Sequence, residues 1–237
     1  MICTNNITSK GHYRFKGIYF FYLATWLFLL PSNTVNSWTL QEFTHRWRRN
    51  EIVYLNDGWD IATVRNYFMK LALHEAEKAG EKGEVPIGAL VVQQRSNHQY
   101  EILSRAGNSV ETNHDASAHA ELLALRRASV RLRNWRLVNT TLYSTLEPCP
   151  MCLAACQAFR INNLVYGAPD LRLGAVETHI RLLDSKHPYH NITDVVKGVQ
   201  SERSASLLRH FFKRRRKKEG KVGLFKNIFM PVFWTRQ

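Results

Sequence analysis

The spacing of the cysteines constrains this chain more than any other feature. Three of the four cysteines, Cys149, Cys152 and Cys156, lie within eight positions, and the fourth, Cys3, is far away. A cluster this tight cannot form the disulfide framework that staples distant segments together. Clustered thiols in a chain that also carries His119 indicate a metal site in a reducing compartment. The fold must therefore bring His119 and the cysteine pair together across the intervening chain.

Cys149 and Cys152 are spaced to fit one turn at the start of a helix, so both sulfurs can point at one ion. A helix N-terminus and a metal both favour thiolate over thiol. His119 completes a set of three ligands. Three protein ligands leave the fourth position of zinc to water, which is the catalytic rather than the structural pattern. Cys156 lies one turn further on, and we expect it in the core rather than as a fourth ligand.

Glu121 follows His119 by two positions and can reach a water at the zinc without binding the metal. Its predicted role is to take a proton from that water and return protons to the substrate. His-x-Glu followed by Pro-Cys-x-x-Cys is the signature of zinc-dependent nucleobase deaminases. Each half alone is weak, but both halves in this order, each at a predicted helix start, are specific.

The hydrophobic pattern predicts alternating helices and strands and hence an α/β fold. Residues 108–117 are expected to form a polar loop, with a solvated His114. The predicted strands cover residues 86–92, 100–106, 140–145 and 163–167. The predicted helices run from Asp60 to Gly80, over 119–130 and 149–159, near 176–183, and over 201–217.

Beyond the zinc signature, the chain resembles the bacterial-type tRNA adenosine deaminases, which make inosine at the first anticodon position. The match covers about residues 59–218. The stretches that carry it are Glu84–Ala89, Asn108 with Asp115–Glu121, Leu146–Cys152, Tyr166–Asp170, Leu182–Asp184 with His187-Pro188, and Leu207-Leu208 with Phe211–Arg216.

This resemblance implies a cytidine deaminase-like three-layer α/β/α fold with a five-stranded mixed sheet, one Zn²⁺ per subunit and a homodimer. It also implies roles for individual residues. Asn108 would hydrogen-bond the flipped base, and Ile87 with the Ala120 backbone would line its pocket. Asp170 would contact the neighbouring nucleotide. The residues expected along the tRNA anticodon stem-loop are Phe211, Phe212, Arg214, Arg215 and Arg216.

The charge distribution supports a nucleic-acid partner. The chain carries a formal net charge of +14, and residues 213–218 form an unbroken basic run beside two phenylalanines. Cations can pair with phosphates while rings stack on unpaired bases. The alternative from composition alone is a solvated basic tail.

The first 58 residues are expected to be a targeting extension. Lys10, Arg14 and Lys16 precede an apolar run over 18–30, which is too short to span a bilayer but fits a secretory signal. An Arg-rich, transit-like stretch follows Trp38. This order resembles the two-part leaders of algae with complex plastids, and a plastid would keep the thiols reduced. A membrane anchor or an unstructured leader is the alternative for the segment, and mitochondrion or cytoplasm for the compartment. We expect no membrane contact in the mature enzyme.

The predicted organisation is therefore an extension over 1–58, a deaminase domain over 59–218 and a basic, apolar tail over 219–237. The predicted function is zinc-dependent hydrolytic deamination of adenosine 34 in a tRNA, with a plastid arginine tRNA as the expected substrate. Two alternatives remain. A small-molecule deaminase would act on cytosine, guanine or a nucleoside. A non-catalytic RNA-binding subunit of a heterodimer would not require Glu121.

Overall fold

A six-stranded mixed sheet organises the residues described by a computed structural model, which are 51–55, 58–185, 187–188 and 190–221. The strands are β1 (Glu51–Tyr54), β2 (Gly88–Ser96), β3 (Gln99–Gly107), β4 (Thr140–Leu146), β5 (Asn163–Ala168) and β6 (Asp194–Val196). Their order across the sheet is β1-β3-β2-β4-β5-β6. The first four strands in this order pair antiparallel, while β4, β5 and β6 run parallel.

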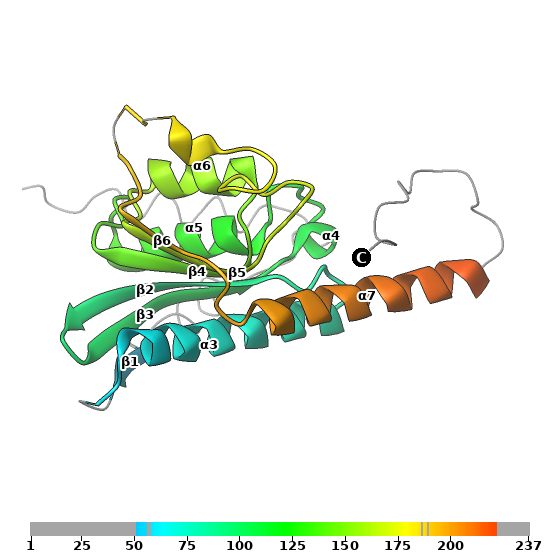
Figure 1. Cartoon of the computed structure of the whole chain (residues 1–237), viewed down its shortest axis with the longest axis horizontal. Helices are drawn as coiled ribbons and strands as arrows, with labels where there is room; N and C mark the ends of the chain where they lie inside the picture. The colour runs from blue at the N-terminus through cyan, green and yellow to red at the C-terminus, as the bar shows by residue number, and fades with distance from the viewer. Residues whose placement is uncertain (1–50, 56–57, 186, 189, 222–237) are drawn as a thin grey trace, which may run out of the picture. The chain divides into compact units, whose positions relative to one another are not determined.

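Helices cover both faces of the sheet, as Figure 1 shows, with α3 and α7 on one side and α5 and α6 on the other. The helices are α3 (Ile61–Glu81), α4 (Val110–Asn113), α5 (Ala120–Leu132), α6 (Pro150–Ala158) and α7 (Ser201–Lys221), with a 3₁₀ turn at Leu182–Asp184. None of the helices in the described part of the chain combines the length and apolar character needed to cross a membrane.

Strand β2 shows why this fold forms. Ala89 and Val91 face the core under α5 and α6, while Leu90 and Val92 face the core under α3. A strand buried on both faces reads as a continuous apolar run rather than an alternating one. Gly88 permits the close approach of α3, because a Cβ there would lie 2.1 Å from the Ala72 carbonyl oxygen.

The predicted strands are confirmed, but the sheet has six strands instead of five. The pattern of the sequence did not predict β1 or β6. Both are short edge strands, and edge strands receive backbone pairing on only one side and little hydrophobic burial. Strand β1 pairs with β3 and lies within the range expected for the targeting extension. The sheet therefore includes residues ahead of position 59.

The long helices begin where expected, and Asp60 caps α3 by accepting a hydrogen bond from the Thr63 N–H at 2.7 Å. The helix predicted near 176–183 is wrong. Turns occupy that segment up to the 3₁₀ turn, because the backbone N–H groups of residues 176–178 donate to the Glu147 side chain. The expected loop over 108–117 contains the short helix α4, and α7 extends to Lys221. The leader over 1–50 and the tail over 222–237 lie outside the described residues.

A partly buried ion-pair triad joins β2, β3 and α5 and predicts acid sensitivity. Arg95 and Arg131 both bind the Glu101 carboxylate, at 2.6 and 3.0 Å. Burial raises the pKa of Glu101, but the hydrogen bonds from the two arginines outweigh it, and the net pKa is lowered. Its stabilising contribution is therefore complete above the unfolded pKa of about 4.3 and is lost as the pH falls through the folded value.

Glu101→Gln is expected to lower the free energy of unfolding at pH 7 by about 2 kcal/mol, because two guanidinium groups lose their carboxylate. Urea denaturation of both proteins at pH 7 and at pH 3 should show the difference shrinking in acid. Glu51→Gln is the matched control, since Glu51 pairs with Arg105 in an exposed position worth less than about 1 kcal/mol. An equal loss of unfolding free energy at both pH values would show that ionised Glu101 does not stabilise the fold.

Candidate functional site: a His–Cys–Cys metal centre

Two helix starts meet at the site. His119 is the N-cap residue of α5, and Cys149 is the N-cap residue of α6, followed by Pro150 in the first turn. Proline suits the first turn of a helix because its missing N–H would have no partner there. Extended backbone at both caps turns these side chains away from the helix axes, and Cys152 follows one turn into α6. The local sequence thus presents all three ligands.

The ligand atoms fit zinc. The His119 Nδ1 lies 3.6 Å from the Cys149 Sγ and 3.5 Å from the Cys152 Sγ. Zn–S distances near 2.3 Å and Zn–N distances near 2.0 Å make the N–S edge of a tetrahedron about 3.5 Å long. All three atoms lie within 4.8 Å of one another. Among the described residues, this is the one group of three or more His, Cys, Asp or Glu that could hold a metal ion.

The two thiols differ in acidity because they share a hydrogen bond. Donation from the Cys152 thiol, with further help from His119, lowers the pKa of Cys149 to about 4. The same hydrogen bond, together with burial, raises the pKa of Cys152. Contact with Cys149 raises the pKa of His119. Cys156 is fully buried in the core and is not a member of the metal group, as expected.

Glu121 lies in the first turn of α5 and is 4% exposed. Burial raises the pKa of its carboxyl, while hydrogen bonds from its own N–H and from the Ser144 hydroxyl of β4 oppose that shift. The position of this carboxyl next to His119 and Cys149 suits a group that must accept and return protons at the metal site. Ser144, itself fully buried, was not anticipated from the sequence.

The structure brings the residues predicted to bind the base to the same end of the sheet. The Asn108 N–H donates to the Ile87 carbonyl at 3.0 Å, and the Ser109 N–H donates to the Ala118 carbonyl at 3.0 Å. These bonds tie the Asn108 loop to the strand entry at Ile87 and to the chain that leads into His119. The half-buried Ile87 packs against the core cluster that contains Ala120.

Two buried glutamates hold the loops of the site, and reasoning from the sequence assigned no role to either. Glu84, 1% exposed, accepts hydrogen bonds from the Asn108 side chain and from the backbone N–H groups of Glu111 and Thr112. Glu147, also 1% exposed, binds the loop that carries Asp170. A charged residue next to an apolar strand or a metal motif is the signal that could have identified both.

The residues of α7 that were expected to contact RNA differ in their exposure to solvent. Phe211 is 7% exposed and, with Gly80 and Gly83 of the α3 end, lines a groove of about 650 Å³. Phe212 is half-buried against Phe211, with ring centroids 5.3 Å apart. Arg214, Arg215 and Arg216 are exposed, and Arg215 lies 4.0 Å from Glu111, three residues after Asn108. The basic end of α7 thus reaches the loop that flanks the metal site.

Known proteins share both the zinc-binding motif and the fold of this chain. Residues 62–168 match the family model of the cytidine and deoxycytidylate deaminase zinc-binding region. With the metal centre described above, this makes the chain a zinc-dependent hydrolytic deaminase of the cytidine deaminase-like class. A guanine deaminase from Nitrosomonas europaea shares the fold, at 21% identity and a TM-score of 0.52, over 68% of this chain and 88% of that one.

Closer relatives define the family. The tRNA-specific adenosine deaminase of Agrobacterium fabrum is 43% identical over 152 residues, which are 64% of this chain and 96% of that protein. A solved structure from a study of tRNA adenosine-34 deaminases at the wobble position is 42% identical, with a TM-score of 0.55, over 60% of this chain and 99% of that chain. The chain belongs to the tRNA-specific adenosine deaminase family.

A plant relative is much longer than this chain. The chloroplastic tRNA(adenine(34)) deaminase of Arabidopsis thaliana is 42% identical over 168 residues, which are 65% of this chain and 12% of that protein. The chain therefore spans only a small part of that protein.

Proposed function

We propose that this protein converts adenosine 34 to inosine in the anticodon of a tRNA by hydrolytic deamination, and that its substrate is an arginine tRNA of a plastid. The observation that carries the proposal is the juxtaposition of the metal ligands and Glu121 with the Asn108 loop and the basic end of α7. Family membership supports adenosine 34 of a tRNA as the target of the reaction. An unpaired anticodon base costs little to extrude into a pocket, which suits this chemistry.

In the proposed reaction different residues bind the metal, transfer protons and hold the base. When held by His119, Cys149 and Cys152, zinc supplies an activated water nucleophile near neutral pH. Glu121 would take one proton from the water as its oxygen bonds to adenine C6, and would deliver that proton to the ring nitrogen N1. It would then carry the proton of the new C6 hydroxyl to the amino group, so that the C6–N bond breaks, ammonia leaves and inosine remains. Asn108 orients the base by hydrogen bonding, and Ile87 and the Ala120 backbone exclude solvent from its faces.

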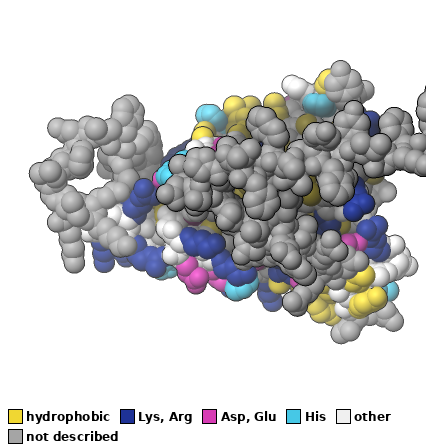
Figure 2. Space-filling model, turned by 180° about the vertical axis from the view of Figure 1, so that it is seen from behind, with side chains coloured by type: hydrophobic (Ala, Val, Ile, Leu, Met, Phe, Trp, Pro, Cys, Tyr) yellow, Lys and Arg dark blue, Asp and Glu magenta, His cyan; other side chains and the backbone are white. Residues whose placement is uncertain are grey.

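The α7 helix is the proposed contact with the anticodon stem-loop. Residues 213–217 of this helix are all basic and exposed, and in the space-filling view of Figure 2 Lys and Arg side chains gather at the lower left. Arg214, Arg215 and Arg216 would pair with phosphates, and Phe212 would offer a ring edge to an unpaired base. Phe211, because it is buried, would contribute by anchoring α7 on α3.

Replacing Arg214 and Arg216 with alanine is expected to weaken tRNA binding and reduce its salt dependence. The slope of log K against log salt should fall by about 0.7 for each lost phosphate contact to a single strand. Filter binding across a salt series measures it. Arg133→Ala with Arg136→Ala is the matched control, because both residues follow the far end of α5. Equal slopes for the two double variants would exclude α7 from the interface.

The activity itself is tested with zinc-loaded protein and unmodified transcripts of the tRNAs that carry adenosine at position 34. Inosine at that position, detected by reverse transcription and sequencing, is the expected product, with the arginine tRNA converted fastest. Absence of inosine from every transcript would sink the proposal. Ammonia released from free cytosine, guanine or nucleosides, without a tRNA product, would identify a small-molecule deaminase instead.

We also propose that the enzyme is a homodimer, as its family resemblance implies. Helix α6 exposes Met151, Ala154 and Ala158, which share one face at three- and four-residue spacing. Light scattering should give twice the subunit mass, and Met151→Lys should shift it toward the monomer. A monomeric wild-type protein at micromolar concentration would contradict the dimer.

For the compartment we propose a plastid. The chloroplastic name of the Arabidopsis relative supports this location, and the leader-like composition of the first 58 residues agrees with it. A fluorescent reporter fused to residues 1–58 should enter the plastid of a complex alga. Reporter in the medium, the cytosol or the mitochondrion would refute the assignment.

A further inference from the structure

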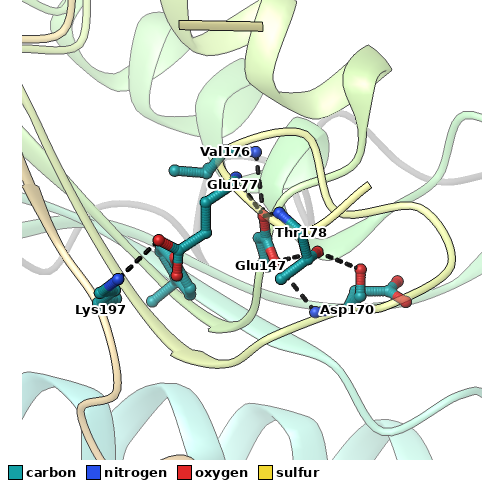
Figure 3. A network of polar contacts seen from close by, with 7 residues as sticks. Glu147, Asp170, Val176, Glu177, Thr178 and Lys197 are labelled. Atoms are coloured by element: carbon teal, nitrogen blue, oxygen red, sulfur yellow. Dashed lines mark hydrogen bonds and ion pairs between the residues drawn. The ribbon is translucent and has the colours of Figure 1, made fainter. Parts of the chain in front are cut away.

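A buried carboxylate, that of Glu147, binds the loop that carries Asp170 (Figure 3). Glu147 lies between the end of β4 and Cys149. Its Oε1 accepts hydrogen bonds from the N–H groups of Val176, Glu177 and Thr178 at 3.0, 2.8 and 3.2 Å. Its Oε2 accepts from the Asp170 N–H at 3.1 Å and from the Thr178 hydroxyl at 2.7 Å. One side chain thus gathers both ends of a nine-residue loop.

Burying a carboxylate is costly unless its oxygens are hydrogen-bonded, so this arrangement is stable only while the loop keeps its conformation. Successive backbone N–H groups that converge on one oxygen form a concave anion-binding nest. Here the anion is supplied from within the chain, two positions before a metal ligand. The loop and the metal site are therefore joined through Glu147 in addition to the packing of Ala175 in the shared core.

Further hydrogen bonds hold the backbone of Asp170 and of its loop in place next to Glu147. The Thr178 hydroxyl, besides meeting Glu147, lies 2.6 Å from the Asp170 carbonyl oxygen, and the Gly174 N–H donates to the same oxygen at 2.8 Å. A Cβ at Gly174 would lie 2.4 Å from the Glu147 carboxylate, so the loop closes tightly around that group. The Ala175 N–H donates to the Pro148 carbonyl at 2.9 Å, next to Cys149.

We propose that Glu147 is a positioning residue for recognition of the nucleotide beside the target adenosine. It holds Asp170 at a set place relative to the metal ligands, so that the neighbouring nucleotide is read only when the target base lies at the metal. This inference rests on the proposed function, in which Asp170 contacts that nucleotide. Glu147 itself touches neither the substrate nor the metal.

The test measures discrimination at the neighbouring nucleotide. Anticodon stem-loops carrying each of the four nucleotides beside adenosine 34 are assayed with the wild type, Glu147→Gln, Thr178→Val, Asp170→Ala and the Glu147→Gln, Asp170→Ala double variant. Thr178→Val removes only the bridging hydroxyl and serves where Glu147→Gln folds poorly. Glu177→Gln is the matched control, because the Glu177 carboxylate binds Tyr166 and Lys197 and not the Asp170 loop.

The Asp170, Glu147 and Thr178 single variants are expected to lose about tenfold in discrimination, mostly through KM, with one zinc per chain retained. The double variant should discriminate no worse than Asp170→Ala alone, because both changes remove the same interaction. The control should match the wild type.

Four results would overturn the inference. Equal losses of activity on all four stem-loops would show a merely structural role for Glu147. A loss of discrimination in Asp170→Ala, without one in Glu147→Gln or Thr178→Val, would show that Glu147 does not position Asp170. Full discrimination in Asp170→Ala would show that Asp170 does not contact the neighbouring nucleotide. If the wild type still forms inosine in that case, the proposed function is unaffected. No inosine from the wild type would defeat both.

Discussion

Glu121→Gln is expected to lower kcat for inosine formation by about 10³-fold while one zinc per chain is retained. Glutamine keeps the size and hydrogen-bonding reach of glutamate but cannot carry a proton between water and the substrate, and such transfer contributes about 10² to 10⁴ in rate. The side chain is buried and is not one of the ligand atoms, so the metal geometry should survive. Single-turnover assays on the stem-loop and zinc determination by atomic emission measure the two quantities.

Glu177→Gln provides the control for this experiment, since it removes an exposed carboxylate outside the metal site. A Glu121→Gln enzyme that retained more than a tenth of the wild-type kcat would show that another group transfers the proton. If the variant lost its zinc, a lower kcat would not report on proton transfer. The kcat and the zinc content are therefore measured on the same preparation.

Cys152→Ser is expected to empty the metal site and abolish activity. Cys152 is fully buried, and its sulfur completes the triangle with His119 and Cys149. A serine hydroxyl is shorter and far less acidic than a thiol, so it is a poor ligand for zinc. Loss of a ligand that binds only the folded state also lowers stability, and we expect a fall of several degrees in Tm.

Cys156→Ala is the matched control for the ligand variant. Cys156 is equally buried and lies one helical turn beyond Cys152, but it packs in the core between α5, α6 and the sheet. Its replacement should cost about 1 kcal/mol of stability and leave zinc and activity in place. Zinc loss from Cys156→Ala, or retained zinc in Cys152→Ser after dialysis against a chelator, would contradict the assigned ligand set.

Local spacing is enough to identify the chemical centre. His119, Glu121, Cys149 and Cys152 each lie within a turn of a helix start, and one helical turn is short enough for spacing alone to set the direction of a side chain. The strands were predictable for a similar reason, because burial on both faces leaves an apolar run. The edge strand at Glu51–Tyr54 was missed because its pairing with β3 joins distant parts of the chain.

The sequence by itself thus determined the His–Cys–Cys group and the class of fold, and it placed Glu121 in the first helical turn after His119. Only the tertiary structure decided how the surrounding loops are held. Glu84 and Glu147 form hydrogen bonds to residues more than twenty positions away, and no local pattern encodes such partners. The same holds for Phe211, which the pattern placed on the RNA side and the packing of α7 on α3 buries. Long-range contacts depend on how elements pack, and packing is settled only when the whole domain folds.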